Sequence, residues 1–600
     1  MRIVIVTVQP DSYLGVDHSA QGRRWVLRQT DDRQVAAMRQ RLGIPDVVAR
    51  VLSARGVGLD QAEAFLNPTL RDQLPDPSHL KDMDKAVERL CSAIRDGEKI
   101  AIFGDYDVDG ATSSALLARF LTAVGVEPVI YIPDRLAEGY GPNAPALQTL
   151  RSQGMAVVVT VDCGITAFAP LQVAADCGLD VIVIDHHEAE PALPVACAVV
   201  NPKRLDDPSP HKHMAAVGVT FLLIVALNRT LKAAGWYQGR CAAPDLMSLL
   251  DIVALGTVCD VVPLVGVNRA LVAQGIKVMA ARRNPGLVAL ADVAGVKERV
   301  DAYHLGYVLG PRVNAGGRVG ECGLGARLLT CDDPQEAVGM ALRLHEYNQE
   351  RQQVEADVLF QAIEQAEGAA LTADDPLLLV AGESWHPGVI GIVAGRLKER
   401  YNVPCCVVAL DGGLAKGSGR SVPGLDLGRA VIAAREAGIL QAGGGHAMAA
   451  GFSLAADRLP DLRAFLTERL RDQLAGGGIS PMLEVDGVVD VQGASADLLE
   501  MLGRVGPYGA GNEEPRFVIP HARIARADIV GQGHVRCFVT GARGGRLKAI
   551  AFKCVDSDLG MLLLNTQGST LHLAGTLRLD SWQGRSEAQL IIDDAAIAQP

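Results

Sequence analysis

This chain lacks the features of a secreted, membrane-embedded or zinc-ribbon protein. Its 12 cysteines are scattered over 600 residues and form no CxxC pair, which argues against a disulfide framework and against a zinc ribbon. No uninterrupted apolar run reaches the roughly 18 residues that a membrane helix needs, and residues 1–15 lack the layout of a signal peptide. We therefore expect a cytoplasmic protein that has no membrane partner.

The chain also lacks the excess of positive charge that is typical of nucleic-acid-binding proteins. Its formal net charge is −12, but cations bound to clustered acids would offset part of that charge. The sign of the net charge therefore does not exclude a polyanionic substrate. Any nucleic-acid surface must instead be a local groove.

The length of the chain predicts several domains, because a single hydrophobic core does not extend over so many residues. We expect an N-terminal extension at 1–80, an α/β domain at 81–335, a connecting helix at 336–370, a second α/β domain at 371–475, and an all-β domain with its lead-in segment at 476–600.

Short apolar runs rich in β-formers alternate with helix-like stretches in the first α/β segment. This alternation predicts a parallel, doubly wound sheet. In such sheets ligands bind beyond the carboxyl ends of the strands. The apolar runs are 99–103, 128–132, 156–161, 181–184 and 198–200, and the helix-like stretches include 111–124 and 167–177.

The remainder of the chain predicts three further structures. Residues 334–366 read as one long charged helix, which could join two lobes across a cleft. A second, smaller α/β unit begins at 377–381. After residue 520, five short strands with glycine-bearing turns suit a small barrel such as an OB-fold.

Acidic and imidazole side chains follow apolar runs at four places, where we expect buried strands to end. Carboxylates repel one another, so clustering them costs free energy unless cations are bound among them. The groups are Asp105, Asp107 and Asp109 in FGDYDVDGAT, Asp162 in VTVDCG, Asp185, His186 and His187 in VIVIDHHE, and Asp260 in LGTVCDVV.

Each group also has a simpler interpretation. The acids of DYDVDG are as well suited to capping a helix as to binding a metal, and Asp162 alone would usually be a cap. A buried salt bridge would explain Asp260. Two adjacent imidazoles are harder to explain by packing, and His187 could face a scissile phosphate while His186 binds a metal.

Taken together, these side chains favour a metal site. Oxygen ligands with one or two imidazoles suit Mn²⁺ or Mg²⁺ better than zinc or copper. The carboxylates outnumber what one ion requires, so we expect two ions. Two such ions would activate a water molecule and stabilise the leaving oxygen of a phosphoryl group.

A second set of residues is basic and lies among glycines. Arg and Ser donate to phosphate oxygens, and glycine lets the backbone approach a ligand closely. Ordinary turn chemistry would explain each segment alone, but phosphate binding is favoured beside a phosphoryl-transfer site. The residues are Arg312 and Arg318 in GPRVNAGGR, Ser418 and Arg420 in KGSGRS, and His446 in GGGH.

The all-β segment carries alternating basic and aromatic residues, as grooves for single strands do. They are Arg536, Phe538, Lys548, Phe552 and Trp582. Phe and Trp in a small barrel are more often core residues, so both interpretations remain open.

The order DYDVDG, VDCG, DHH and a later buried Asp resembles the DHH phosphoesterase superfamily. The further motifs GPRVNAGGR, SWHPGVIGIVAGRL, SGRS, GGGHAMAAGF and PYGAGNEEPRF make the chain similar to one family within it, the RecJ family of bacterial single-strand-specific 5′→3′ DNA exonucleases. The likeness extends from roughly residue 35 to the end of the chain, and the motifs occur in the family's order.

The resemblance implies a catalytic DHH domain joined by a long helix to a DHHA1 domain, followed by an OB-fold. It also implies release of 5′-mononucleotides from single-stranded DNA in recombination and repair. A single-strand-binding protein and a helicase would be possible protein partners.

By this resemblance, the site residues have distinct roles. Asp162 would bridge two ions, and Asp105 and His187 would support the site. The metal ligands would be Asp107, Asp109, Asp162, His186 and Asp260. Ser418, Arg420 and one of Arg312 or Arg318 would hold the 5′-phosphate of the DNA, and His446 would line the nucleotide pocket.

Three other functions compete with this one. Smaller DHH–DHHA1 phosphodiesterases act on short oligonucleotides, but the barrel-like tail favours a long polymer. A catalytically inactive single-strand-binding scaffold should have lost ligands, and every motif acid and both histidines are present. A Rossmann nucleotide-binding domain is disfavoured because the first strand is not followed by GxGxxG.

Overall fold

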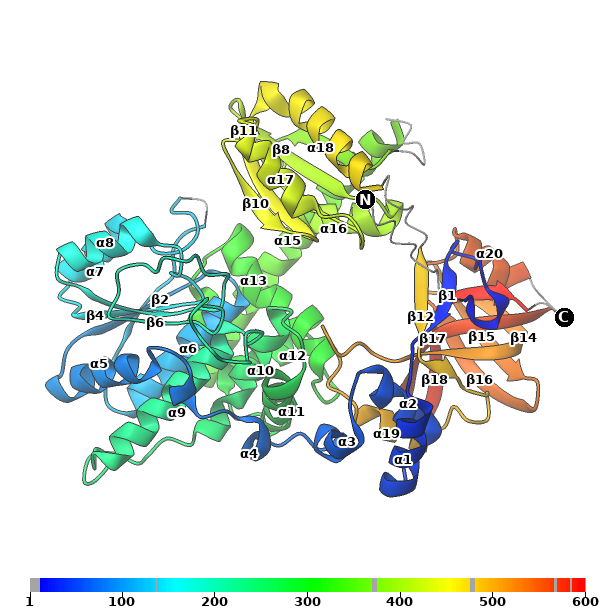
Figure 1. Cartoon of the computed structure of the whole chain (residues 1–600), viewed down its shortest axis with the longest axis horizontal. Helices are drawn as coiled ribbons and strands as arrows, with labels where there is room; N and C mark the ends of the chain where they lie inside the picture. Colours follow the sequence, from blue (N-terminus) through cyan, green and yellow to red (C-terminus); the bar gives the residue numbers. More distant parts are fainter. Residues whose placement is uncertain are drawn as a thin grey trace, which may run out of the picture. The chain divides into compact units, whose positions relative to one another are not determined.

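The computed structural model consists of two compact units along one chain (Figure 1). The first unit contains Met1–Pro75, Val261–Lys277 and Ser480–Pro600, and the second contains Asp76–Asp260 and Val278–Ile479. The structure describes residues 11–135, 137–368, 375–474, 481–565, 569–582 and 585–598. The apolar stretch at the very start of the sequence lies outside these ranges.

A five-stranded parallel sheet forms the centre of the second unit, as the apolar runs predict. Its strand order is β3-β2-β4-β5-β6, and every neighbouring pair is parallel. The strands are β2 (Ile100–Gly104), β3 (Val129–Tyr131), β4 (Val157–Val161), β5 (Asp180–Ile184) and β6 (Ala198–Val200). The predicted doubly wound α/β fold is confirmed.

Helices cover both faces of this sheet (Figure 1). The helices α7 (Ala144–Ser152) and α8 (Phe168–Asp176) pack on one face, and α5 (Met83–Asp96), α6 (Val108–Ala123) and α9 (Ala216–Ala233) pack on the other. Both faces are buried, which explains why β2 and β4 are apolar without alternation.

Helix α9 is long and apolar enough to pass for a membrane span by length and composition, with a mean hydropathy of 1.5 over 18 residues. Its sequence is not an uninterrupted apolar run, because Arg229 and Lys232 lie in its last turns. Two thirds of the window is buried inside the protein, where α9 packs against α5, α6 and α10. This arrangement is that of a core helix.

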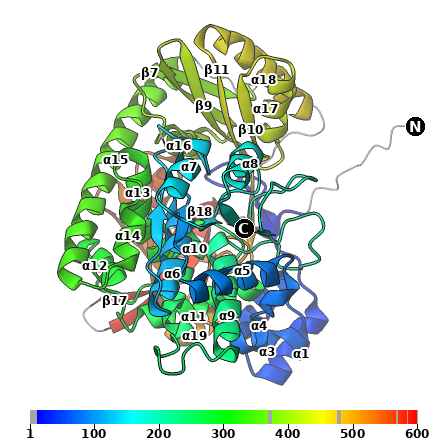
Figure 2. The same ribbon diagram turned by 90° about the vertical axis from the view of Figure 1, so that its left-hand side faces the viewer.

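A helical layer continues the second unit after the sheet. One long helix, α15 (Pro334–Gly368), follows it and confirms the predicted single helix (Figure 2). The elements before α15 are α10 (Leu250–Cys259), α12 (Pro285–Val293), the π-helical turn η4 (His304–Leu309), α13 (Gly310–Val319) and α14 (Leu324–Thr330).

A second sheet, mixed in direction, follows α15 and has the order β10-β11-β9-β8-β7. Helices α15 and α16 (Ile390–Tyr401) cover one face, while α17 (Leu427–Glu436) and α18 (Leu459–Leu474) cover the other. The adjacent residues Cys405 and Cys406 belong to the two separate cores. The strands are β7 (Leu378–Glu383), β8 (Cys405–Asp411), β9 (Leu414–Arg420), β10 (Ala442–His446) and β11 (Ala449–Ala455).

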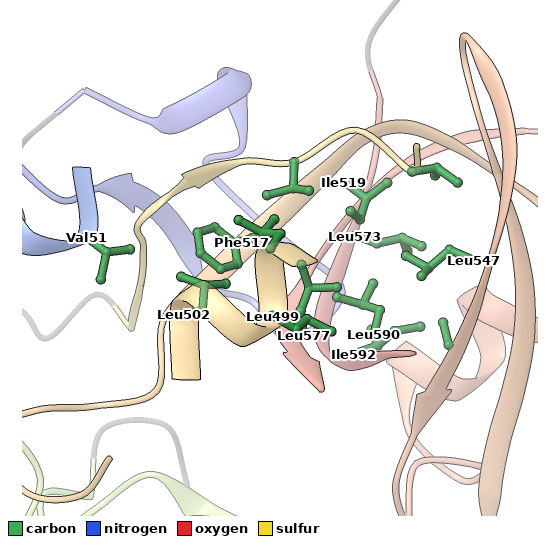
Figure 3. Close-up of a cluster of buried hydrophobic side chains, with 14 of the residues drawn as sticks. Val51, Leu499, Leu502, Phe517, Ile519, Leu547, Leu573, Leu577, Leu590 and Ile592 are labelled. Carbon is green, nitrogen blue, oxygen red and sulfur yellow. The ribbon is translucent and has the colours of Figure 1, made fainter. Parts of the chain in front are cut away.

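The first unit contains the predicted five-stranded barrel. Strands pair in the order β14-β15-β16-β18-β17, and β17 also pairs with β14, so the sheet closes on itself. Leucine and isoleucine side chains fill its interior (Figure 3). The strands are β14 (Arg516–Val530), β15 (His534–Gly541), β16 (Gly544–Ala551), β17 (Thr570–Trp582) and β18 (Arg585–Ile597), with α20 (Asp558–Asn565) between β16 and β17.

The N-terminal segment is an integral part of this unit. Strand β1 (Arg24–Leu27) pairs in parallel with β12 (Met482–Val485), and the fully buried Trp25 donates to Asp594. The sequence assigned no role to this segment. Its neighbouring arginines both form ion pairs, Arg23 with Asp594 and Arg24 with Asp17.

The helices after β1 extend the barrel core. They are α1 (Asp32–Leu42), α2 (Asp46–Ala54) and α3 (Leu59–Leu66), and Val51 of α2 lies in the same hydrophobic cluster as Leu502 and Phe517 (Figure 3). In α11 (Gly266–Met279), the buried Arg269 donates to the carbonyls of Phe65 and of residues 504–506.

Two of the aromatic residues predicted for a groove on the barrel, Phe538 and Phe552, do not belong to its core. Phe552 is 55% exposed. Phe538 is half-buried and lies under the guanidinium of Arg546, 4.1 Å from the ring centre. The side chain of Trp582 lies outside the described residues.

Candidate active site

The acidic and imidazole residues meet at one edge of the parallel sheet. Gly104, Val161 and Ile184, the last residues of β2, β4 and β5, are aligned across the sheet. Asp105, Asp162 and the Asp185–His187 motif follow them directly. Strand register therefore places three groups that are distant in sequence beside one another.

Ligand atoms from seven side chains gather there in three groups suited to a metal ion. Within each group one ligand atom per residue lies within 4.8 Å of the others. The groups are Asp105, Asp107 and Asp162; Asp109, His186 and Asp260; and Asp162, His186 and His187. Asp162 and His186 each occur in two groups, which suits a site for two ions.

His186 is held as a neutral ligand. Its Nδ1 lies 3.1 Å from the carbonyl oxygen of Met214, which fixes the proton on Nδ1 and leaves the Nε2 lone pair free. The Nε2 atom lies 3.3 Å from an oxygen of Asp162 and 3.6 Å from one of Asp260. Burial lowers the pKa of His186 to about 4.

Four polar atoms at the centre of the cluster are buried and have no hydrogen-bond partner among the residues that the structure describes. They are Asp105 Oδ1, Asp162 Oδ1, His186 Nε2 and Asp260 Oδ2. Buried polar atoms are normally paired, because leaving one unpaired costs free energy. Three carboxylate oxygens and one imidazole nitrogen are a donor set that fits Mn²⁺ or Mg²⁺.

The cluster raises the pKa of its own carboxyl groups. Burial, with the neighbouring Asp107 second, raises the pKa of Asp105 to about 8 and that of Asp109 to about 7. Burial and then the charges of Asp109 and Asp107 raise the pKa of Asp260 to about 9. The pKa of Asp162 is raised for the same reasons. A bound cation removes this penalty.

Asp107 and Asp109 each accept hydrogen bonds from the backbone and each also belong to a group of potential metal ligands. Asp107 is the N-cap of α6, and its Oδ1 accepts from the backbone of Gly110 at 3.1 Å. Both oxygens of Asp109 accept from the backbone amides of Ala216 and Val217, at 2.6 and 2.9 Å. These hydrogen bonds orient carboxylates that still face the cluster.

Asp162 is not a helix cap. Helix α8 begins at Phe168 and its N-cap is Ala167. Asp162 itself has a φ of 63°, a left-handed conformation that costs free energy for a residue other than glycine and that concentrates at functional sites.

The expectation that Asp260 follows a buried strand is wrong. Asp260 is the C-cap of helix α10. Helix α10 is buried on most sides, so its sequence is apolar without helical periodicity and resembles a strand. No Lys or Arg among the described residues lies within ion-pair distance of Asp260, so a buried salt bridge does not explain it.

Asp185 orients the two histidines and is fully hydrogen-bonded. It accepts from the backbone amides of Ile165, His186 and His187 and lies 2.8 Å from His187 Nδ1. Burial raises the pKa of Asp185, but His187 outweighs it and the pKa falls to about 2. Burial lowers the pKa of His187, and Asp185 more than offsets this, so the net pKa is raised.

Sequence reasoning missed Tyr140 at this site. Its hydroxyl lies 3.3 Å from His187 Nδ1 and donates to the carbonyl of Asp162 at 3.2 Å. Tyr140 stands in the segment between β3 and α7, where no motif singled it out. Its exposed ring meets His187 edge-on.

The basic residues divide into two places. Arg318 donates to the carbonyl of Gly388 at 2.6 Å. Gly391, three residues further, approaches β9 so closely that a Cβ would lie 3.0 Å from Ser418 Oγ and 3.3 Å from Arg420 Nη2. The segment 388–391 therefore contacts Arg318 at one end and approaches Ser418 and Arg420 at the other.

Arg312 lies elsewhere, bonded to the carbonyl of Val308 and to His345. His446 ends β10 and is exposed, and it pairs with Ala449, which pairs in turn with Arg420. The structure therefore places His446 in the same row of residues as Arg420, two strands away.

Three family models match successive parts of the chain. The DHH family N-terminal domain matches residues 99–257, the DHHA1 domain matches residues 374–472, and the RecJ OB domain matches residues 485–594.

Curated relatives and a solved structure extend this likeness over nearly the whole chain. The single-stranded-DNA-specific exonuclease RecJ of Escherichia coli is 36% identical over 92% of this chain and 96% of its own length, and that of Bacillus subtilis is 34% identical over 96% and 71%. The crystal structure of Thermus thermophilus RecJ in complex with Mn²⁺ superposes with a TM-score of 0.80 at 28% identity, covering 96% of this chain and 80% of that one. This chain therefore belongs to the RecJ family of single-stranded-DNA-specific exonucleases.

Proposed function

We propose that this protein is a metal-dependent exonuclease that degrades single-stranded DNA from its 5′ end and releases 5′-mononucleotides. The observation that carries the proposal is the set of four buried, unpartnered ligand atoms on Asp105, Asp162, His186 and Asp260. Two Mn²⁺ or Mg²⁺ ions would satisfy them and supply an activated water and charge stabilisation for phosphodiester hydrolysis.

We assign different roles to the side chains of the cluster. Asp162 occurs in two of the three groups of potential ligands, so we assign it the position that bridges the two ions. Asp107, Asp109, His186 and Asp260 complete the ligand sets. Asp105, beside Asp107 and Asp162, supports the site.

His187 is assigned to the scissile phosphate. Its raised pKa keeps the imidazole protonated to higher pH, and Asp185 holds the Nδ1 side of the ring. The Nε2–H is then available to a phosphate oxygen, where an imidazolium donor stabilises developing negative charge.

The 5′-phosphate is assigned to Ser418, Arg420 and Arg318, with His446 lining the nucleotide pocket. Arg318 is chosen over Arg312 because Arg318 bonds to Gly388, in the segment that also approaches Ser418 and Arg420. The charge of Asp107 also acts on Arg318, so the guanidinium interacts electrostatically with a proposed metal ligand. An anchor here would place the first phosphodiester bond over the metal ligands.

We keep the sequence-based division of the chain as a proposal, with boundaries at 1–80, 81–335, 336–370, 371–475 and 476–600. We also propose a cytoplasmic location and action in DNA recombination and repair. A single-strand-binding protein and a helicase are its proposed protein partners.

Degradation of end-labelled DNA tests the proposal. With Mn²⁺ or Mg²⁺, the full chain is expected to release a 5′ label from single-stranded DNA as a mononucleotide, and to leave blunt duplex intact. EDTA should stop the release. Strands that are bound but never shortened would point to a scaffold, and cleavage limited to di- to pentanucleotides would point to a small-substrate phosphodiesterase.

Arg318→Ala is expected to reduce the preference for a 5′-phosphate over a 5′-hydroxyl by about 10- to 100-fold, because a charge-assisted hydrogen bond contributes about 1.5–3 kcal/mol. The measurement compares kcat/KM on both ends of the same oligonucleotide. Arg312→Ala is the matched control and should keep the wild-type ratio. If the Arg312 variant lost the preference instead, the assignment of the two arginines would be reversed.

A further inference from the structure

Two tyrosines form an exposed aromatic stack on the π-helical turn η4. The rings of Tyr303 and Tyr307 lie 5.3 Å apart at an interplanar angle of 29°. They are 51% and 75% exposed. A ring so exposed gains little from burial, so the packing of the core does not explain Tyr307. π-Helical turns occur frequently at functional sites.

This stack lies close to a proposed metal ligand. The inner side of η4 packs on the last turn of α10, where Cys259 donates to the carbonyl of Leu305 at 3.4 Å. Gly310 fits there only because it lacks a side chain, since a Cβ would lie 2.4 Å from Cys259 Sγ. The residue after Cys259 is Asp260. The tyrosines therefore stand on the outer side of the turn that supports this end of α10.

A guanidinium is hydrogen-bonded to the backbone of the same turn. The Nη1 atom of Arg312 donates to the carbonyl of Val308, which is the residue after Tyr307, at 2.6 Å. Its Nε atom donates to His345 at 3.2 Å. No carboxylate in the described part of the chain lies within ion-pair distance of Arg312, and its half-buried guanidinium is held in place by these two bonds.

An exposed aromatic stack on a turn to which a cation is also bonded suits the binding of one nucleotide of a single strand. Stacking on an aromatic side chain tolerates any base, because every base has a π-face. A protein partner would need roughly 800 Å² on this side, far more than two rings provide. The observations therefore favour a nucleobase as the occupant.

We propose that Tyr307, supported by Tyr303, stacks on a base of the single-stranded substrate, while Arg312 binds the phosphate next to that base. This inference rests on the proposed function, because it takes the occupant to be the strand that the metal centre cleaves. The subsite is separate from the 5′-phosphate anchor at Ser418 and Arg420. It would hold the strand in place while each terminal nucleotide is removed.

Fluorescence of 2-aminopurine in a single-stranded oligonucleotide tests this subsite without catalysis. The full chain in EDTA is titrated with oligonucleotides labelled at successive positions. Stacking is expected to quench the label at one position or at two adjacent ones. Tyr307→Ala should abolish that quenching and weaken binding about tenfold, which corresponds to about 1.4 kcal/mol. Tyr307→Phe should preserve both, because the aromatic face remains.

Two further variants separate stacking from charge and from general surface effects. Arg312→Ala should reduce the salt dependence of binding by about one phosphate contact, whereas Tyr307→Ala should leave it unchanged. Phe360→Ala removes another exposed aromatic ring, 64% exposed on α15, and should change neither quenching nor affinity. Equal quenching in Tyr307→Ala and wild type would overturn the subsite, while 5′-label release by the wild-type protein would leave the nuclease function standing. A wild-type protein that neither binds nor shortens single strands would overturn both.

Discussion

Asp162→Asn is expected to abolish metal-dependent DNA cleavage, lowering kcat by about a thousandfold or more. Asp162 shares ligand groups with Asp105, Asp107, His186 and His187, so its loss disrupts both proposed ion positions at once. A thousandfold loss corresponds to about 4 kcal/mol of transition-state stabilisation. The measurement is single-turnover release of the 5′ label under saturating Mn²⁺.

The same substitution is expected to leave the metal-free fold intact or to stabilise it. An amide matches the volume of the carboxylate, tolerates the left-handed backbone at φ 63°, and brings no charge into a cluster that raises the pKa of Asp162. The melting temperature in EDTA should therefore be equal to or above that of the wild type. An inactive variant that also melted early would instead indicate a folding defect.

Asp251→Asn provides a matched control for this experiment. Asp251 is also a buried aspartate of the same unit, and burial raises its pKa to about 6. It belongs to none of the groups of potential metal ligands found among the described residues. Its replacement should keep cleavage near the wild-type rate. If Asp162→Asn kept that rate too, the bridging role of Asp162 would be wrong.

The sheet and most of the metal-site cluster could be predicted from the sequence because both depend on local patterns. Buried parallel strands are short and rich in apolar, β-branched residues. This pattern is present in Val157–Val161 and Val181–Ile184 and predicts both strands. Parallel strands also end at the same edge, so residues directly after them must meet. Asp105, Asp162 and His186 follow from this rule alone.

The remaining features depend on contacts that no local pattern encodes. Asp260 reaches the cluster from the end of helix α10, although the apolar run before it suggested a strand. Strand β1 pairs with residues more than 450 positions away, so Trp25 is recognisable as a core residue only once the barrel is formed. Tyr140 and Tyr307 stand outside every motif, and their positions follow from the packing of a loop and of η4.

Mn²⁺ is expected to raise the melting temperature far more at pH 9 than at pH 6. In the metal-free protein Asp109, Asp105 and Asp260 have pKa values raised to about 7, 8 and 9, against about 3.9 in an unfolded chain. Between these limits the folded state binds more protons than the unfolded one. The stability that these groups contribute is therefore fully present below about pH 4 and is lost as the pH rises to about 9.

Bound ions reverse this trend, because they require deprotonated carboxylates and remove the repulsion that raised the pKa values. Metal binding thus releases protons, and the apparent affinity rises with pH. At a hundred times the dissociation constant the ion adds about 2.7 kcal/mol of stability. Melting curves from pH 6 to 9, in EDTA or in Mn²⁺ at equal ionic strength, measure the difference. If the metal-induced shift in melting temperature stayed constant across this range, these carboxyl groups would not be the ligands. A shift that grows with pH and is smaller in Asp162→Asn would assign the stabilisation to this cluster.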